Sequence, residues 1–148
     1  MVKIILTIVL MFCFIIPAYC HSVPMELYKG IIAEDTSGDY QVYLAIASVV
    51  HNRLQKGMTI GLVALNRQDL DNFINQEYWY AKTKGVDLIK ISTQAIKEVF
   101  YNNIDTTNGA TNYEHTGVYP VPKYTRIMQI CKIMFMGTKK EITFWREK

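Results

Sequence analysis

The chain has 148 residues, half of them hydrophobic, and a formal net charge of +3 at pH 7. This length suits one domain with a substantial core and is too short for two ordinary domains. The mild positive charge, without an arginine-rich stripe, permits an anionic polymer as partner but excludes the basic surface typical of nucleic-acid-binding proteins.

The first residues, Met1–Cys20, have the pattern of a secretory signal peptide. Lys3 supplies the positive end, and Ile4–Ile16 forms an apolar run of the right length. A membrane anchor would need roughly 18 or more apolar residues, which this run does not reach. We therefore expect a secreted protein that meets a membrane only during export, with one domain over residues 21–148.

Cysteine usage agrees with this expectation. Cys13 and Cys20 belong to the signal, so the mature domain keeps only Cys131 and cannot form an internal disulfide. A lipoprotein with a lipidated Cys20 is the weaker alternative, because Tyr19 is bulky at a position where such sites usually carry a small residue.

The segment after the signal predicts a helix over Met25–Ala33. Ser22 is a candidate N-cap, and Pro24 suits the first turn. Four residues share one face by the i, i+3, i+4, i+7 rule, namely Leu27, Gly30, Ile31 and Glu34. The carboxylate of Glu34 therefore continues the stripe that faces inward.

The strongest helical pattern follows a turn at residues 36–39. Asp39 can cap the next helix. Apolar residues repeat at helical spacing from there: Val42, Ala45, Ile46, Val49, Val50 and Leu54. The opposite side is apolar as well, so we predict a central helix, buried nearly all round, that ends at Lys56-Gly57.

The middle of the chain predicts a short polar helix that starts near Arg67. Residues 75–87, NQEYWYAKTKGVD, are aromatic and basic with little periodicity, which suggests a surface loop. Ser92 is a candidate cap for a third helix, whose inward residues are Ala95, Ile96, Val99 and Phe100.

The C-terminal part predicts strands. Residues 105–124 form a long, turn-rich loop with a short strand, and long loops in compact domains are often functional. The remainder is interpreted as two strands around residues 137–140, because β-branched and aromatic residues fill Ile142–Trp145. A helix through Met128–Met136 is the alternative. The expected fold class is α+β: helix-rich, with a small antiparallel sheet.

Glu34 is the first candidate for chemistry. A carboxylate on an apolar helical face loses solvation, and this raises the pKa of such a group towards the value that a general acid needs. Alternatively, Glu34 is an exposed helix end or forms an ion pair with Arg53 or a lysine. A negative charge at a helix C-terminus is electrostatically unfavourable, so helix stability does not explain its position.

Two-carboxylate glycosidases need a second Asp or Glu about 5 to 10 Å away. The sequence marks none of the available residues, which are Asp35, Asp39, Asp69, Asp71, Glu77, Asp105 and Glu114. Asp39 is close to Glu34 in the chain, but its role as a helix N-cap is the better explanation.

A nucleophilic cysteine and a metal site are less favoured. Cys131 lies in an apolar, strand-like context that suits an inert core thiol, and a nucleophilic couple with His115 is the less favoured alternative. His21, His51 and His115 show no metal-ligand spacing, and phosphate-binding glycine loops are absent, so we expect no metal and no cofactor.

Aromatic residues could line a groove where flat rings stack on sugars. They lie at positions 78–80, in the later loop and near the C-terminus. Most such rings belong to a core or its rim, but we expect at least one of Trp79, Tyr113 and Tyr119 to line a groove.

Three segments of the chain share the pattern of a known family. They are GIIAEDTSGDYQVYLAIASVVHNRL, NGATNYEH and KKEITFWR. Together they resemble the spore cortex-lytic (SleB-like) family of cell-wall hydrolases. The first resembles its opening motif, in which a helix ends in Glu and a long Ala/Val helix closes with Asn-Arg, the second its later Gly-Ala-Thr-His-Tyr segment and the third its final strand. Two positions differ: Ser37 and Gly38 stand where the family usually has Gly and Glu, and Asn112 stands where it has His.

The resemblance implies a peptidoglycan-cleaving enzyme with a lysozyme-like, helix-rich fold and a small sheet. The family's catalytic Glu falls on Glu34, which would act alone as acid and then base in a lytic transglycosylase. Such enzymes cleave between N-acetylmuramic acid and N-acetylglucosamine, and the sugar's own hydroxyl leaves an anhydro end. The alternatives are a muramidase-type hydrolase that uses water and a non-catalytic module that binds cell-wall glycan.

The expected partner is therefore a peptidoglycan glycan strand, not a nucleic acid. Glu34 is the expected catalytic residue, and the expected substrate-binding residues are Asn112, Tyr113, Asp39, Tyr119 and Trp79. Asn52 and Arg53 are expected to be structural, tying the later loop around Glu34.

Overall fold

The structure is a computed structural model that describes residues 23–115, 124–133 and 139–147. The predicted signal peptide, the candidate cap Ser22 and the candidate glycan-binding residue Tyr119 lie outside these residues.

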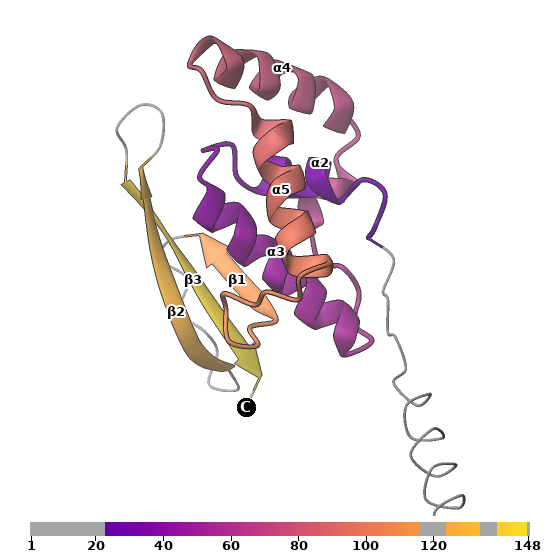
Figure 1. The fold of residues 1–148 in the computed structure, drawn as a ribbon, viewed down its shortest axis with the longest axis vertical. Helices are drawn as coiled ribbons and strands as arrows, with labels where there is room; N and C mark the ends of the chain where they lie inside the picture. Colours follow the sequence, from indigo (N-terminus) through magenta and orange to yellow (C-terminus); the bar gives the residue numbers. More distant parts are fainter. Residues whose placement is uncertain (1–22, 116–123, 134–138, 148) are drawn as a thin grey trace, which may run out of the picture.

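Helices and a small sheet form the two parts of the fold (Figure 1). In chain order the elements are α2 (Leu27–Glu34), α3 (Tyr40–Gln55), the 3-10 helix η1 (Val63–Asn66), α4 (Leu70–Thr83), α5 (Leu88–Phe100), β1 (Asn112–His115), β2 (Tyr124–Ile133) and β3 (Lys139–Glu147). The sheet is antiparallel with the order β1-β3-β2, so β3 is its central strand. The predicted α+β class is confirmed.

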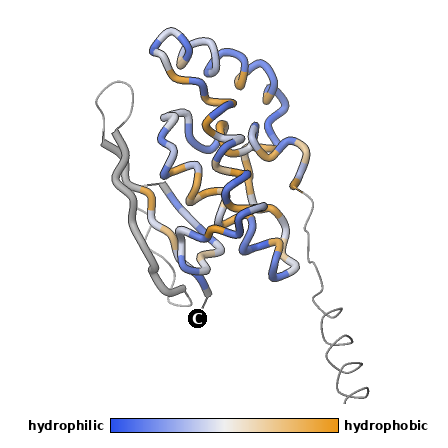
Figure 2. The backbone as a smooth tube through the Cα atoms, in the orientation of Figure 1, coloured by the Kyte–Doolittle hydropathy of each residue, from blue (hydrophilic) through white to orange (hydrophobic). Residues whose placement is uncertain are grey.

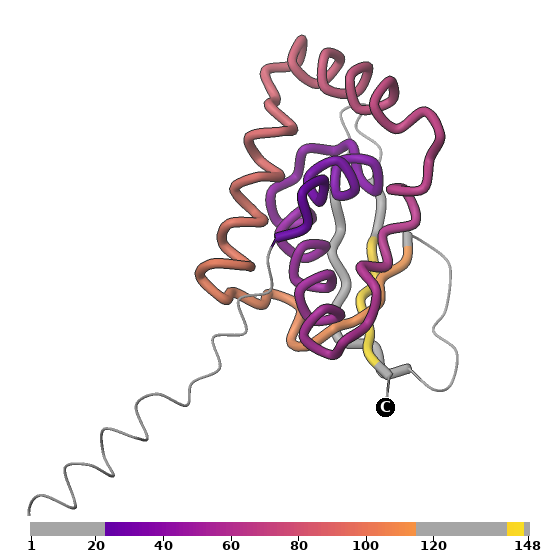
Figure 3. Tube along the Cα trace, turned by 90° about the vertical axis from the view of Figure 1, so that its right-hand side faces the viewer, coloured from indigo at the N-terminus to yellow at the C-terminus, as the bar shows by residue number. Residues whose placement is uncertain are grey.

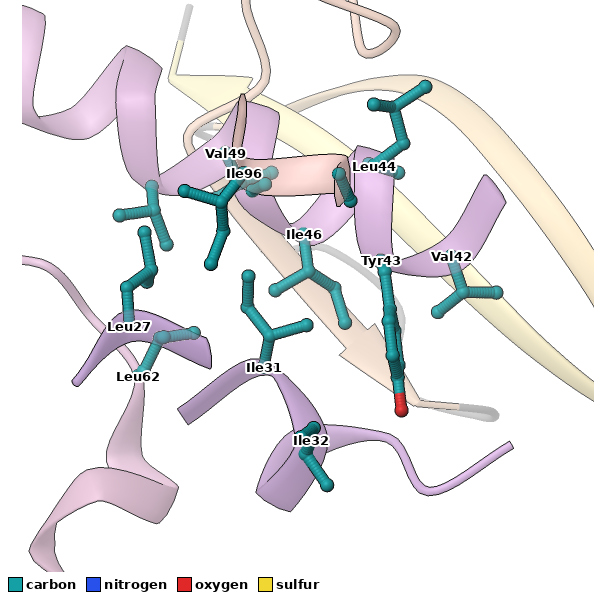
Figure 4. Packing of buried hydrophobic residues seen from close by; sticks show 14 of the residues in the cluster. Leu27, Ile31, Ile32, Val42, Tyr43, Leu44, Ile46, Val49, Leu62 and Ile96 are labelled. Atoms are coloured by element: carbon teal, nitrogen blue, oxygen red, sulfur yellow. The ribbon is translucent and has the colours of Figure 1, made fainter. Parts of the chain in front are cut away.

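Helix α3 is the centre of the hydrophobic core. Every residue from Val42 to His51 is buried, as its two apolar faces predicted. Side chains of α2, α3, α5 and the segment before η1 point towards one another in Figure 4. From the sheet, Ile142 and Phe144 of β3 are buried in the same core. This packing fixes the C-terminal end of α2 against the rest of the molecule.

Two predicted helix starts are corrected. Helix α2 begins at Leu27, not Met25, because the backbone N–H of Leu27 first finds the carbonyl of Pro24 in a preceding turn. Helix α5 begins at Leu88, because the Asp87 carboxylate accepts a hydrogen bond from the N–H of Lys90 and caps it. Ser92 is therefore not a cap but a buried residue inside the helix, whose hydroxyl donates to the carbonyl of Ile89.

The predicted surface loop at residues 75–87 is wrong, because helix α4 continues to Thr83. Its buried anchors are few and widely spaced: Leu70, Ile74 and Ala81. The aromatic side chains of Trp79 and Tyr80 point outward instead, which hides the helical period in the sequence. Figure 2 shows the mostly hydrophilic character of this helix.

The predicted strand pair at the C-terminus is confirmed by β2 and β3. The alternative helix is wrong for Met128–Ile133, which pair with β3. Strand β3 already includes Lys139 and Lys140, two residues of the predicted turn. In the part of the chain that the structure describes, no helix combines the length and apolar character needed to cross a bilayer.

Candidate functional site

Glu34 is the last residue of α2 and is half-buried, beside the 3-10 helix η1. The backbone N–H of Ala64 donates a 3.1 Å hydrogen bond to Glu34 Oε1. Among the described residues Glu34 forms no salt bridge, so neither Arg53 nor a lysine is the ion-pair partner considered from the sequence. A direct backbone donor therefore holds the carboxylate in place.

Gly30 allows η1 to approach α2 this closely. A Cβ atom at this position would lie 2.7 Å from Leu62 Cδ1 and 2.9 Å from Leu65 Cγ, well inside contact distance. The missing side chain thus lets the segment around η1 pack directly on α2. This contact brings the Ala64 donor to Glu34, one helical turn further along the same face.

A cavity of about 280 Å³ opens beside Glu34, and we call it the Glu34 cavity. Its lining comes from α2, α3, the segment before α4 and strand β1: Glu34, Val49, Arg53, Gly61, Val63, Thr111, Asn112, Tyr113 and Glu114. Figure 3 shows the segment around η1 running beside β1. The structure therefore brings together three of the residues selected from the sequence, Glu34, Asn112 and Tyr113.

Tyr113 connects the sheet to Glu34. Its ring packs on Phe144, its partner across the β1–β3 pair, with 6.0 Å between ring centroids. Burial raises the pKa of the Tyr113 hydroxyl well above its ordinary value, and the negative charge of Glu34 and a side-chain hydrogen bond with it act in the same direction. The phenol therefore stays protonated and can donate to the Glu34 carboxylate.

Arg53 fastens the two walls of the Glu34 cavity to each other. From α3, its Nε and Nη2 donate to the carbonyl and hydroxyl oxygens of Thr59 at 2.7 and 3.4 Å. Its Nη1 donates to the carbonyl of Thr111 at 2.9 Å. These hydrogen bonds agree with the structural role expected for Arg53 from the sequence.

Asn52 secures the chain that leads into β1. Its amide nitrogen donates to Asp105 Oδ2, Thr107 Oγ1 and the carbonyl of Ala110, at 3.1 to 3.3 Å. Partial burial would raise the pKa of the Asp105 carboxyl, but hydrogen bonds from Thr107, Gly109 and Asn52 outweigh this and hold that pKa below its ordinary value. The carboxylate thus organises the turn before the cavity wall.

The polar residues of the turn between α2 and α3 are used to build the turn itself. Asp35 is buried and its Oδ1 accepts hydrogen bonds from the N–H of Ser37, at 2.9 Å, and from the Ser37 hydroxyl. The Ser37 hydroxyl oxygen accepts in turn from the N–H of Asp39. Asp39 caps α3 through the N–H groups of Gln41 and Val42, as predicted, and does not line the Glu34 cavity.

The other candidates lie elsewhere. Trp79 is 65% exposed on α4, packs edge-on against Tyr78 and does not line the Glu34 cavity. Cys131 and His115 belong to β2 and β1, which lie on opposite sides of β3. Two strand spacings, about 9 to 10 Å, separate their backbones, which disfavours a nucleophile–base couple. Among the described residues no group of His, Cys, Asp and Glu could hold a metal ion.

Sequence reasoning missed the wall formed by residues 59–63. Gly61 has a φ of +76°, and a Cβ there would lie 2.5 Å from Arg53 Nε, so the guanidinium passes directly over this glycine. The sequence signal for this wall was the pair Gly57 and Gly61 beside an apolar stretch, but no periodicity related these residues to Glu34. Glu114 is one of the available carboxylates in the sequence, but no sequence pattern around it indicates that it lines the Glu34 cavity.

Comparison with known proteins identifies no relative of this chain. The chain matches no family model, no curated protein and no solved structure.

Proposed function

We propose that this protein is a secreted peptidoglycan glycosidase of the lytic transglycosylase type, with a lysozyme-like fold and with Glu34 as its catalytic acid. The observation that carries the proposal is the Glu34 cavity, where the acid meets Asn112 and Tyr113 from the later motif. The SleB-like family motifs contain these same positions, at distant places in the sequence. Their convergence on one cavity supports the resemblance.

In the proposed reaction the protonated Glu34 gives its proton to the glycosidic oxygen as the bond from that oxygen to the anomeric carbon breaks. A hydroxyl of the same muramic acid residue then forms the new bond to the anomeric carbon, and its proton returns to Glu34. The acid is thereby regenerated and no water is consumed. The N–H of Ala64 binds Oε1 and so holds the carboxyl group in one orientation during both steps.

Tyr113 and Asn112 have different parts in this proposal. The Tyr113 hydroxyl stays neutral and donates a hydrogen bond that orients the Glu34 carboxylate. Asn112 is half-buried on the wall of the cavity, and its amide donates to Thr111 Oγ1 at 3.1 Å. This contact orients the Asn112 amide, whose oxygen would accept a hydrogen bond from the glycan.

Glu114 is the observation that favours the hydrolase alternative, because a second carboxylate at the same cavity could activate water. Neighbouring residues of a strand, however, point to opposite faces. Tyr113 is directed towards Phe144 and Glu34, so Asn112 and Glu114 share the other face of β1, although all three residues line the cavity. The products of cleavage therefore decide between the single-carboxylate reaction and the hydrolase.

The test is to incubate the purified chain with peptidoglycan and to identify the released muropeptides by mass spectrometry, beside the Glu34→Gln variant. Gln keeps an oxygen for the Ala64 hydrogen bond but cannot supply the proton, so we expect cleavage to fall about 10²- to 10⁴-fold. Anhydro ends support the transglycosylase, and reducing ends would indicate the hydrolase. Binding without products would indicate the glycan-binding module, and undiminished products with Gln would exclude Glu34 as the acid.

A further inference from the structure

A second cavity lies next to the Glu34 cavity, along the segment before α4. It has a volume of about 470 Å³ and is lined by the segment from residue 59 to residue 66. The two cavities share Gly61 and Val63 as lining residues. We call this segment, Thr59–Asn66, the η1 wall.

The Glu34 cavity alone is small for a polymeric substrate. Its volume of about 280 Å³ lies just below the range for ligand pockets, about 300 to 1,000 Å³. The second cavity, at about 470 Å³, lies within this range. A glycan whose cleaved bond lies at Glu34 therefore has room to continue along the η1 wall.

The η1 wall is held rigidly before any ligand binds. Thr59 accepts hydrogen bonds from Arg53, and the N–H of Ala64 is bound to Glu34. Leu62 is buried, and Ile60 and Leu65 pack against the core. A surface fixed at these points loses little conformational entropy when it binds a ligand.

Val63 is an exposed aliphatic residue on this wall: 76% of it is exposed, although its neighbour Leu62 is buried. Val63 lines both cavities and directly precedes Ala64, whose backbone N–H binds Glu34. Aliphatic surface in this position matches the apolar face of a sugar ring or the methyl group of an N-acetyl substituent. Asn66, at the far end of the wall, supplies polar groups for sugar hydroxyls.

We propose that the η1 wall binds the N-acetylated sugar next to the cleaved bond, with Val63 as its apolar contact and Asn66 as its polar contact. This inference rests on the proposed function and names the positioning residues of the same site. It requires a substrate long enough to occupy both cavities, so affinity depends on the η1 wall, whereas proton transfer depends on Glu34.

The test compares Val63→Ser and Asn66→Ala with the wild-type chain on purified glycan strands. Val63→Ser adds no charge beside Glu34. The matched control is Ile104→Ser, an exposed aliphatic residue that lines neither cavity. We expect Val63→Ser to raise KM about tenfold, with a smaller change in kcat, and the control to leave both unchanged. Thermal unfolding of each variant verifies that it is folded.

A second measurement uses the Glu34→Gln background and titrates glycan strands by calorimetry. The dissociation constant should rise about tenfold when Val63→Ser is added, and not with Ile104→Ser. A wild-type chain that cleaves strands while neither η1-wall variant changes KM or the dissociation constant would overturn this inference and leave the proposed function standing. A wild-type chain that neither binds nor cleaves strands would overturn both.

Discussion

The Glu34 cavity and a groove between α4 and α5 differ in how their polar groups are held. The Glu34 cavity has walls from distant segments, joined by the hydrogen bonds of Arg53 and by the hydrogen bond from Ala64 to Glu34. The other region, which we call the α4–α5 groove, has a volume of about 520 Å³ and is lined by Tyr78, Asp87, Ile89, Lys90, Thr93, Gln94 and Lys97.

The α4–α5 groove is larger, but the acidic residue in its lining, Asp87, serves the helices themselves. Asp87 caps α5 and pairs with Lys82 at 2.7 Å, and both side chains are solvent-accessible. Exposed pairs of this kind contribute little and fix no geometry for a ligand. The comparison shows that the Glu34 cavity stands out because hydrogen bonds from distant segments fix its polar groups, and not because of its volume.

The largest effect is expected from removing the tie between the cavity walls. Arg53→Met keeps the aliphatic stem but leaves the buried carbonyl of Thr111 without its donor, so the free energy of unfolding should fall by about 3 kcal/mol. Chemical denaturation measures this. Lys97→Met in the α4–α5 groove is the control and should change it by less than about 0.5 kcal/mol. Equal losses in both variants would contradict the distinction between the regions.

Gly30→Ala tests the close approach of α2 and η1. The new methyl group collides with Leu62 and Leu65, and the resulting strain should cost about 2 kcal/mol and displace Ala64 from Glu34. We expect peptidoglycan cleavage to fall together with the unfolding free energy. Gly85→Ala is a control for backbone strain alone: nothing lies within 4 Å of its added Cβ, but its φ of +77° should cost about 1 kcal/mol without lowering cleavage per folded molecule. If Gly30→Ala retained full cleavage, the Ala64 contact would not matter for the reaction.

Two variants of Asp39 test whether this residue has a structural or a substrate-binding role. Asp39→Ala removes the cap of α3 and should lower the unfolding free energy by about 1 kcal/mol, whereas Asp39→Asn keeps a cap oxygen and should cost much less. Neither variant should change KM for glycan strands if Asp39 serves only as a cap. A raised KM in both would restore the substrate-binding role predicted from the sequence.

The pH dependence of stability tests the turn at Asp105. The pKa of Asp105 is lowered in the folded state, so its contribution is fully present above the unfolded pKa of about 4 and is lost as pH falls through the folded value. The stability difference between wild type and Asp105→Asn should therefore be larger at pH 7 than at pH 3. Denaturant unfolding at both pH values measures it, and a difference that grows towards acid pH would have the wrong sign.

The smallest effect is expected on the outer face of α4. Trp79→Ala should change the unfolding free energy by less than about 0.5 kcal/mol and leave glycan cleavage unchanged, because the ring is largely exposed and lines no part of the Glu34 cavity. Unfolding and muropeptide assays check both values. Weaker binding of glycan strands would show that α4 carries a further contact with the wall polymer, as the sequence suggested for this residue.

Much of the helical core was predictable, because α3 repeats its apolar residues at helical spacing and Asp39 marks its start. Helix α4 was not, because only Leu70, Ile74 and Ala81 are buried along it. The start of α5 was misplaced for a related reason: Asp87 and Ser92 are both cap-forming residues, and only the packing of Leu88 selects the first.

Local patterns in the sequence were sufficient to predict Glu34 at the end of an inward helical face and the two strands that complete the fold. The surroundings of Glu34 depend instead on contacts between elements that are distant in the chain. Its neighbours Ala64 and Tyr113 are distant in the chain, and no local pattern records that Gly30 admits η1 or that Arg53 joins the walls. Such contacts depend on packing between elements, which periodicity along one element does not encode.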